Sequence, residues 1–181
     1  YGLRVADLLA YEDALATVLG ACTPAGTERV ALRDGLGRVL AVAPAVTEPL
    51  PPFANSAMDG FALRADDLRA RGGRLRLTDA IPAGTDPPPL SVGDAAPIAT
   101  GGPIPPGADT IVPIEDATRA DGWVVVTGAV ARGAHIRLAG SDLATGATPL
   151  SVGQVLDPAA GAVLAAIGAA TVEVYRRPVV S

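Results

Sequence analysis

The sequence contains no lysine, and all 14 of its basic residues are arginine. A Schiff-base lysine, a lysyl-nucleotide intermediate and a P-loop lysine are therefore excluded within this chain. Cysteine and histidine occur once each, as Cys22 and His135, so no intrachain disulfide can form and no transition-metal site of protein ligands is expected. The chain also lacks a Gly-x-Ser-x-Gly motif, which argues against a hydrolase with a nucleophile elbow.

Aromatic residues are scarce as well: there are six among 181 residues, whereas 36 alanines supply much of the 49% apolar share. Glycine and proline, with 21 and 17 residues, interrupt the chain too often for a helical bundle. They follow no collagen-like period, and the composition is too apolar for a disordered chain. The length allows one large domain or two small ones, with enough residues for a core that needs no disulfide.

Positive charge is in deficit, since 19 acidic residues leave a net charge of −5. The densest group of arginines lies within 64–76, where Asp66 and Asp67 interleave with them and aromatic residues are absent. Nucleic-acid-binding domains are usually basic, so we interpret this group as a solvated surface and expect no nucleic-acid partner. No apolar run approaches the length of a membrane span, and Tyr1 opens no signal-peptide pattern. We therefore expect a cytoplasmic protein that binds no membrane.

Two helices are predicted, one near each end of the chain. Apolar residues recur at helical spacing over 5–19, and Gly20 followed by Thr23-Pro24 is expected to end this helix. The second helix is predicted over 159–167, with Asp157 as its N-cap and Gly168 as its C-cap. The apolar stripe of the first helix needs a covering surface and consists of Val5, Leu8, Leu9, Leu15, Ala16 and Leu19.

The segment 50–140 is typical of short strands and turns. Asp121-Gly122, directly before Trp123, predicts a tight hairpin because these residues accept positive φ values. Long helices do not alternate with strands here, which argues against a parallel α/β sheet. Strands are predicted over 60–63, 75–78, 96–99, 110–114 and 123–127 in this segment, and over 29–32 and 171–175 outside it.

Three turn-rich motifs carry the residues best suited to chemistry, and the first of them spans 51–62. This first motif brings an amide, a hydroxyl and a carboxylate close together on a stiff loop, at Asn55, Ser56 and Asp59. Such a loop could bind an anion through its N–H groups or a cation through its carboxylate. The alternative is an ordinary turn that leads into a hairpin.

The second motif spans 100–107 and the third spans 133–142. In the second, Thr100 could donate to a phosphate oxygen beside a flexible Gly-Gly pair, although a structural turn is the alternative. In the third, Arg137 could pair with a carboxylate or an anionic substrate, and Asp142 with a metal or a donor.

Taken in this order, the three motifs resemble those of the molybdopterin molybdenumtransferase family, which includes the E domain of gephyrin. The first reads Pro-x-Phe-x-Asn-Ser-Ala-Met-Asp-Gly-Phe-Ala from Pro51. The second reads Ala-Thr-Gly-Gly-Pro-Ile-Pro-Pro-Gly-Ala-Asp from Ala99, and the third Gly-Ala-His-Ile-Arg-x-x-Gly-x-Asp from Gly133. A fourth stretch, Val-Glu-Val-Tyr-Arg-Arg-Pro from Val172, is similar to the family's lead-in to its next domain. The resemblance covers nearly the whole chain.

The resemblance implies an enzyme of the last step of molybdenum cofactor assembly. Its substrates would be molybdate and adenylylated molybdopterin, AMP would be released, and Mg²⁺ would be the cofactor. The protein would be an elongated homodimer, with a molybdopterin adenylyltransferase as its upstream partner. No cluster of protein ligands for a metal is expected, although Asp59 and Asp142 could contact Mg²⁺. The matching motifs imply catalytic roles for Asp59, Thr100 and Asp142, and substrate binding by Asn55, Ser56 and Arg137.

The sequence departs from the family pattern at three positions and in its extent. In the third motif Leu138 and Ser141 stand where the family commonly has charged residues, which changes the electrostatics of that loop. In the second motif Gly102 replaces alanine, a small steric change. The family continues with a molybdopterin-binding domain and a small β-domain. We therefore expect the N-terminal portion of a longer protein, inactive by itself.

Patterns and resemblance together predict an α+β, mainly β fold, elongated and dimeric. A β-rich domain, 50–139, would be inserted into a mixed α/β scaffold and dimerisation domain formed by 27–49 and 140–177. The helix within 1–26 would pack on the absent molybdopterin-binding domain, and 178–181 would begin the next domain. The alternative function is a non-catalytic binding or dimerisation module of the same fold.

Overall fold

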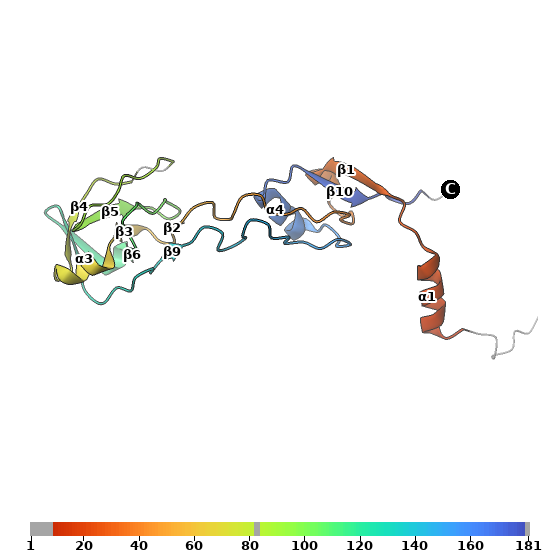
Figure 1. The fold of residues 1–181 in the computed structure, drawn as a ribbon, viewed down its shortest axis with the longest axis horizontal. Helices are drawn as coiled ribbons and strands as arrows, with labels where there is room; N and C mark the ends of the chain where they lie inside the picture. The colour runs from red at the N-terminus through yellow and green to blue at the C-terminus, as the bar shows by residue number, and fades with distance from the viewer. Residues whose placement is uncertain (1–8, 82–83, 180–181) are drawn as a thin grey trace, which may run out of the picture. The chain divides into compact units, whose positions relative to one another are not determined.

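The computed structural model describes residues 9–81 and 84–179 of the chain. The chain divides into two compact units, which we call the terminal unit (1–44 with 148–181) and the inserted unit (45–147). Both contain helices and strands (Figure 1), and β structure predominates, which confirms the mainly β fold class.

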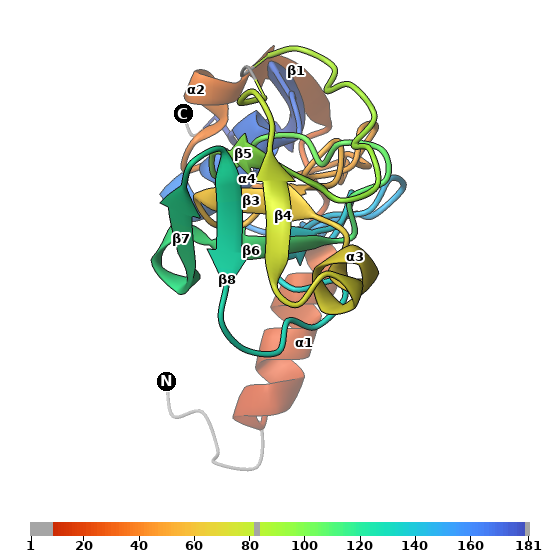
Figure 2. The same cartoon turned by 90° about the vertical axis from the view of Figure 1, so that its left-hand side faces the viewer.

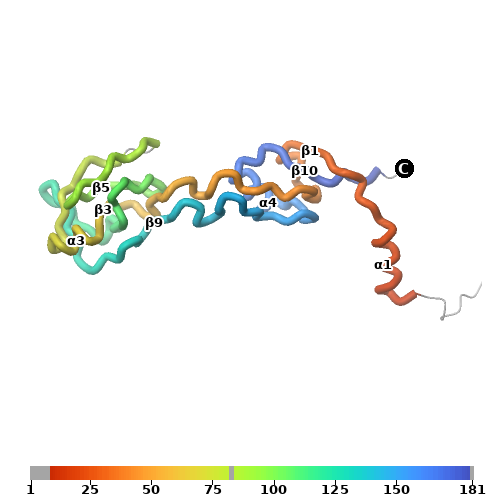
Figure 3. Tube along the Cα trace, in the orientation of Figure 1, coloured from red at the N-terminus to blue at the C-terminus, as the bar shows by residue number. Residues whose placement is uncertain are grey.

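The inserted unit extends further at both ends than the predicted 50–139. The reason is that its entering and leaving segments pair with each other. The backbone N–H of Val46 donates to Ala147 at 2.8 Å, and Leu50 forms an antiparallel bridge with Leu143. Figure 3 follows these two segments side by side.

The terminal unit is built around a two-stranded antiparallel sheet. Thr27 pairs with Tyr175 at one end of this sheet, and Ala31 pairs with Thr171 at the other. The helices and strands of this unit are α1 (Tyr11–Ala21), β1 (Thr27–Ala31), α2 (Leu32–Gly35), α4 (Pro158–Ala166) and β10 (Thr171–Tyr175). Its core consists of Leu40, Leu150, Leu156, Ala160, Leu164, Val172 and Val174.

Helix α4 confirms the predicted second helix to within one residue. The Asp157 side chain accepts a hydrogen bond of 2.7 Å from the backbone N–H of Ala160, so it is the N-cap. Pro158 occupies the first turn, where its missing N–H costs no helical hydrogen bond. The C-cap is Ile167, one residue before the predicted Gly168, and Gly168 follows with φ +79°, a conformation in which glycine commonly ends a helix.

Helix α1 begins at Tyr11 and ends at Ala21, between the two predicted stop signals, Gly20 and Thr23-Pro24, so its predicted C-terminal end is confirmed to within two residues. A single glycine costs a helix only about 1 kcal/mol, and the chain leaves the helix at Cys22, just before Pro24. Residues 5–8 of the predicted helix lie outside the described residues. None of the α1 residues is buried. None of the helices in the described part of the chain combines the length and apolar character that a bilayer span requires.

A six-stranded sheet forms most of the inserted unit, in the order β6-β3-β5-β4-β8-β7 (Figure 2). All its strand pairs are antiparallel except β4 with β5. The six strands are β3 (Gly60–Leu63), β4 (Arg74–Leu77), β5 (Asp94–Ile98), β6 (Thr110–Pro113), β7 (Ala117–Ala120) and β8 (Trp123–Val126). All seven predicted strands, here and in the terminal unit, are confirmed to within two residues at either end.

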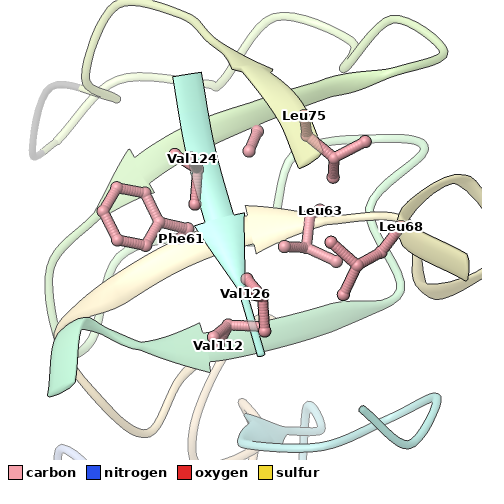
Figure 4. Packing of buried hydrophobic residues seen from close by; sticks show 8 residues of the cluster. Phe61, Leu63, Leu68, Leu75, Val112, Val124 and Val126 are labelled. Carbon is pink, nitrogen blue, oxygen red and sulfur yellow. The ribbon is translucent and has the colours of Figure 1, made fainter. Parts of the chain in front are cut away.

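The core of the inserted unit lies inside this curled sheet (Figure 4). Strand alternation turns Phe61 and Leu63 inward, where they meet side chains from the other strands and from α3 (Ala65–Ala70). Ala62 points to the opposite face and packs with Ile98 and Ile111. The full inner cluster comprises Phe61, Leu63, Leu68, Leu75, Ala95, Val112, Val124 and Val126.

Two of the three turn-rich motifs pack on the outer face of the sheet. Ile104 of the second motif and Ile136 of the third pack against the cluster around Ala62. The sheet therefore serves as a platform for these loops. The remaining elements of the unit are η2 (Ile114–Asp116), β2 (Asn55–Ser56) and β9 (Ile136–Arg137).

The predicted hairpin is confirmed at Asp121-Gly122. Ala120 and Trp123 are paired across the turn, which joins β7 to β8. Asp121 has φ +49° and Gly122 has φ +79°, the two positive values that a two-residue hairpin turn of this kind needs.

Candidate functional site

The two-residue strand β2 brings the three motifs together. On one side it pairs with β9, with Asn55 opposite Arg137 and Ser56 opposite Ile136. On the other side Ser56 exchanges two backbone hydrogen bonds with the second motif, donating to Gly102 at 3.0 Å and accepting from Gly101 at 2.8 Å. The first motif therefore lies between the other two and fixes both by main-chain hydrogen bonds.

Asn55 and Ser56 are buried, with 5% and 1% of their surface exposed. The Ser56 hydroxyl donates to the carbonyl of Met58 at 2.6 Å, and the Asn55 amide donates to the carbonyl of Phe53 at 3.3 Å. Oδ1 of Asn55 has no hydrogen-bond partner among the described residues. Both side chains shape the first motif from within, and their predicted contact with a substrate stays a prediction.

Asp59 and Thr100 form a close pair at the surface. Oδ1 of Asp59 accepts the backbone N–H of Thr100 at 2.7 Å and its hydroxyl at 2.8 Å. These bonds, the backbone one first, lower the pKa of Asp59 below its ordinary value. The carboxylate is therefore ionised at neutral pH, and its Oδ2 accepts no hydrogen bond from the described chain.

The predicted bond from Thr100 to a substrate phosphate would compete with this pair. A hydroxyl has one proton, and Thr100 donates it to Asp59. In this geometry the hydroxyl can accept a hydrogen bond from a ligand, but it cannot donate one. Thr100 is thus first of all a residue that positions Asp59.

The position directly after Asp59 has room only for glycine. A Cβ atom at Gly60 would lie 2.1 Å from the carbonyl oxygen of Val112 on the neighbouring strand β6, which no side chain tolerates. The backbone N–H of Ile114 also donates to the carbonyl of Asp59 at 3.0 Å. The main chain of Asp59 is therefore held directly against the sheet.

Arg137 and Asp142 form a second pair, across the third motif. Nη2 of Arg137 lies 2.5 Å from Oδ2 of Asp142, and both side chains are about half exposed. The backbone N–H of Asp142 donates to Leu50 at 2.9 Å, which ties this end of the motif to the residue just before the first motif. The sequence predicted that Arg137 pairs either with a carboxylate of the chain or with an anionic substrate. The structure shows the first of these, with Asp142 as the carboxylate. Leu138 and Ser141, the departures from the family pattern, are both exposed beside this pair.

His135 contributes to the third motif through its backbone. Its backbone has φ +56°, and its carbonyl accepts the N–H of Ala57 at 2.9 Å. No three His, Cys, Asp or Glu side chains within residues 9–81 and 84–179 gather as a metal site.

A pocket of about 700 Å³ adjoins the second motif, and the motif reasoning did not find it. Its lining includes Thr100 and the half-exposed Phe53, and its opposite wall comes from a loop outside all three motifs. The one sequence signal that could have pointed to this pocket is Phe53, an aromatic residue in a loop that two prolines stiffen. The lining residues are Phe53, Ala54, Ile81, Gly84, Thr85, Asp86, Pro87, Ala99, Thr100, Gly101, Gly102, Pro103, Ile104 and Pro106.

Residues 9–168 match the family model described as the MoeA N-terminal region, domains I and II. A molybdopterin molybdenumtransferase of Synechococcus elongatus is 38% identical over 178 residues, which cover 94% of this chain and 44% of that protein. The molybdopterin molybdenumtransferase 2 of Mycobacterium tuberculosis is 36% identical over 172 residues, or 92% of this chain and 42% of that protein.

A solved structure supports the same relationship. The MoeA protein of molybdopterin biosynthesis from Pyrococcus horikoshii superposes with a TM-score of 0.88 at 32% identity, over 95% of this chain and 47% of that one. The chain thus spans less than half the length of the relatives it matches.

Proposed function

The chain belongs to the MoeA N-terminal family, and from this membership we propose that it is the N-terminal part of a molybdopterin molybdenumtransferase. The complete protein would take molybdate and adenylylated molybdopterin, release AMP and leave molybdenum on the dithiolene. Its role would be in molybdenum cofactor biosynthesis, in the cytoplasm, as a homodimer that receives its substrate from a molybdopterin adenylyltransferase.

The meeting of the three motifs around β2 is the observation that supports this proposal best. Segments far apart in the sequence combine to present Asp59, Thr100 and Asp142 at the surface, while Asn55 and Ser56 hold the loops from inside. Fixed side chains on a rigid platform are what binding and chemistry require.

Asp59 would act as an ionised carboxylate beside the substrate's phosphate or molybdate. Because the two bonds from Thr100 favour its charged form, it needs no other partner to stay ionised at neutral pH. Two anions repel each other, so a carboxylate in this place needs a cation between it and the substrate. Arg137 supplies a positive charge of its own, which Asp142 orients and partly neutralises.

Mg²⁺ is the cation we propose for this place, because the available ligands are carboxylate oxygens. Mg²⁺ is usually held by one or two carboxylates together with substrate phosphates, and it retains several waters. Oδ2 of Asp59 would serve as one ligand, and Oδ1 of Asp142, which has only a long 3.5 Å contact with the hydroxyl of Ser141, as another. When bound, Mg²⁺ would neutralise charge that develops on the phosphate during AMP release.

We expect Asp59→Asn and Asp142→Asn to lower the rate of AMP release by about 100-fold each in the complete protein, because each removes a negative charge from the site. The measurement is AMP release from adenylylated molybdopterin in the presence of molybdate and Mg²⁺. Asp66→Asn is the matched control, since Asp66 is an exposed carboxylate of α3 outside the three motifs.

Three outcomes separate the possibilities. Loss in the two site variants but not in the control supports the proposed roles. Unchanged rates in both site variants would show that the site is assigned to the wrong residues. A complete wild-type protein that releases no AMP would favour the alternative, a non-catalytic binding or dimerisation module.

A further inference from the structure

The pocket beside the second motif is a partly open hollow that the proposed roles of Asp59 and Asp142 leave unused. Its volume of about 700 Å³ lies within the range of small-molecule sites, roughly 300–1,000 Å³. Thr100 lines this pocket, and its hydroxyl also donates a hydrogen bond to Asp59. The pocket therefore lies next to the Asp59 carboxylate, with Thr100 in contact with both. A ligand group seated here would lie next to the candidate catalytic pair.

The charge of the lining indicates what kind of group fits. Among the described lining residues Asp86 is the only one with an ionisable side chain, although the chain has 14 arginines. Without a cation, a pocket with one carboxylate disfavours phosphate or molybdate. It suits an uncharged group that carries N–H donors.

Phe53 gives the pocket an aromatic wall. The other phenylalanine of the chain, Phe61, is 1% exposed in the core, whereas Phe53 is 48% exposed at the pocket. The carbonyl of Phe53 is held by the amide of Asn55, and Pro52 precedes it, so its backbone is well fixed. A fixed, half-exposed ring offers a flat apolar surface on which a planar heterocycle can stack.

The Gly-Gly pair of the second motif leaves the adjoining wall of the pocket without side chains. Gly101 has φ +80°, which disfavours any side chain, and a Cβ at Gly102 would lie 2.9 Å from the carbonyl oxygen of Ala99. With no side chains at these two positions, a ring can approach the backbone closely. Apolar residues, among them Ile81, Pro103 and Ile104, form much of the remaining surface.

We propose that this pocket takes the pterin ring of the substrate, an inference that rests on the proposed function for the identity of the ring. A pterin presents its ring N–H and its 2-amino group side by side, as two adjacent donors. A carboxylate can accept both at once, and Asp86 supplies the one carboxylate among the described lining residues. Adenine, the other heterocycle of adenylylated molybdopterin, places an acceptor beside its amino donor and matches a carboxylate less well.

The test measures equilibrium binding of two neutral probes, 6-hydroxymethylpterin and adenosine, to the complete protein. Wild type is expected to bind the pterin more tightly than adenosine. Phe53→Ala should weaken pterin binding about tenfold, because a stacking surface is lost, and Phe53→Tyr should retain it. Asp86→Asn should weaken pterin binding and leave adenosine binding equal or stronger, because an amide offers one donor and one acceptor.

Val92→Ala is the matched control, since Val92 is an exposed apolar side chain of the same unit outside the pocket lining. It should change neither affinity. Thermal unfolding of each variant shows whether the fold is intact, and Phe53→Tyr keeps the test valid if Phe53→Ala is unstable. Tighter binding of adenosine than of the pterin, or pterin binding that Phe53→Ala and Asp86→Asn both leave unchanged, would overturn the proposal.

Failure of this inference is distinguishable from failure of the proposed function. If the complete wild-type protein releases AMP and Phe53→Ala leaves the KM for adenylylated molybdopterin unchanged, the pocket is wrongly assigned and the function stands. If pterin binding follows the pattern above but wild type releases no AMP, the pocket stands as a pterin site and the proposed reaction is wrong.

Discussion

Thr100 and Asp59 share one hydrogen-bonded unit, and this decides what each can do. The resemblance predicted a role for each residue, but not that one positions the other. Their contact joins loops 41 residues apart, which no local pattern in the sequence reports. The same holds for Asn55 and Ser56, whose residue types indicate hydrogen bonding but do not reveal that the side chains point inward.

Removing the Thr100 hydroxyl should move the pKa of Asp59. Thr100→Val deletes the side-chain hydrogen bond and keeps the backbone one, which is the larger cause of the lowered pKa. We therefore expect the pKa of Asp59 to rise part of the way toward its ordinary value of about 3.9. A ¹³C NMR titration of the Asp59 carboxyl measures this directly.

The lowered pKa of Asp59 also makes the stability of the folded state depend on pH. A lowered pKa in the folded state gives stability that is present above the unfolded pKa and is lost as the pH falls through the folded pKa. In Thr100→Val the loss should begin at the same pH as in wild type, because the unfolded pKa is unchanged, but it should be smaller and be complete at a higher pH. Thr118→Val, at an exposed threonine of β7, is the control and should leave the Asp59 titration unchanged. An Asp59 pKa that is equal in Thr100→Val and wild type would contradict the role given to the hydroxyl.

At the scale of elements, the sequence predicted the caps and turns that a few neighbouring residues determine by themselves. The cap at Asp157 and the turn at Asp121-Gly122 are local, and the structure confirms both. Strand β7 was missed because its residues are mostly exposed and do not alternate. The two-residue strands β2 and β9 were missed as well, since their existence depends on pairing with each other.

Helix α1 yields a prediction of its own. It has 11 residues, none of them buried, and helices this short are marginal in water without packing. We proposed from the resemblance that a molybdopterin-binding domain covers it. Backbone amides of α1 should therefore exchange with solvent within seconds in the isolated chain and be strongly protected in the complete protein, as hydrogen exchange with mass spectrometry can show. Equal exchange in both proteins would mean that the helix packs on nothing in the complete protein.

At the scale of the whole molecule, exposed apolar side chains gather in the terminal unit. The segments 36–42 and 152–156 are paired by backbone hydrogen bonds, including one from Leu40 to Gln154 at 2.9 Å. Apolar side chains that stay exposed on neighbouring segments often mark an interface. Both segments fall within the predicted dimerisation domain. The exposed residues on them are Leu36, Val42, Val152 and Val155.

The proposed homodimer should therefore depend on this surface. Val155 is 55% exposed in the single chain, so Val155→Asp should leave the unit folded. At a dimer interface, however, it would bury an unpaired carboxylate, which is strongly unfavourable. We expect light scattering to give twice the monomer mass for the complete wild-type protein and the monomer mass for Val155→Asp. Val92→Asp, which puts the same charge on an exposed valine of the inserted unit, should remain dimeric. A monomeric wild type would contradict the dimer itself, whereas a dimeric Val155→Asp would show that the interface lies elsewhere.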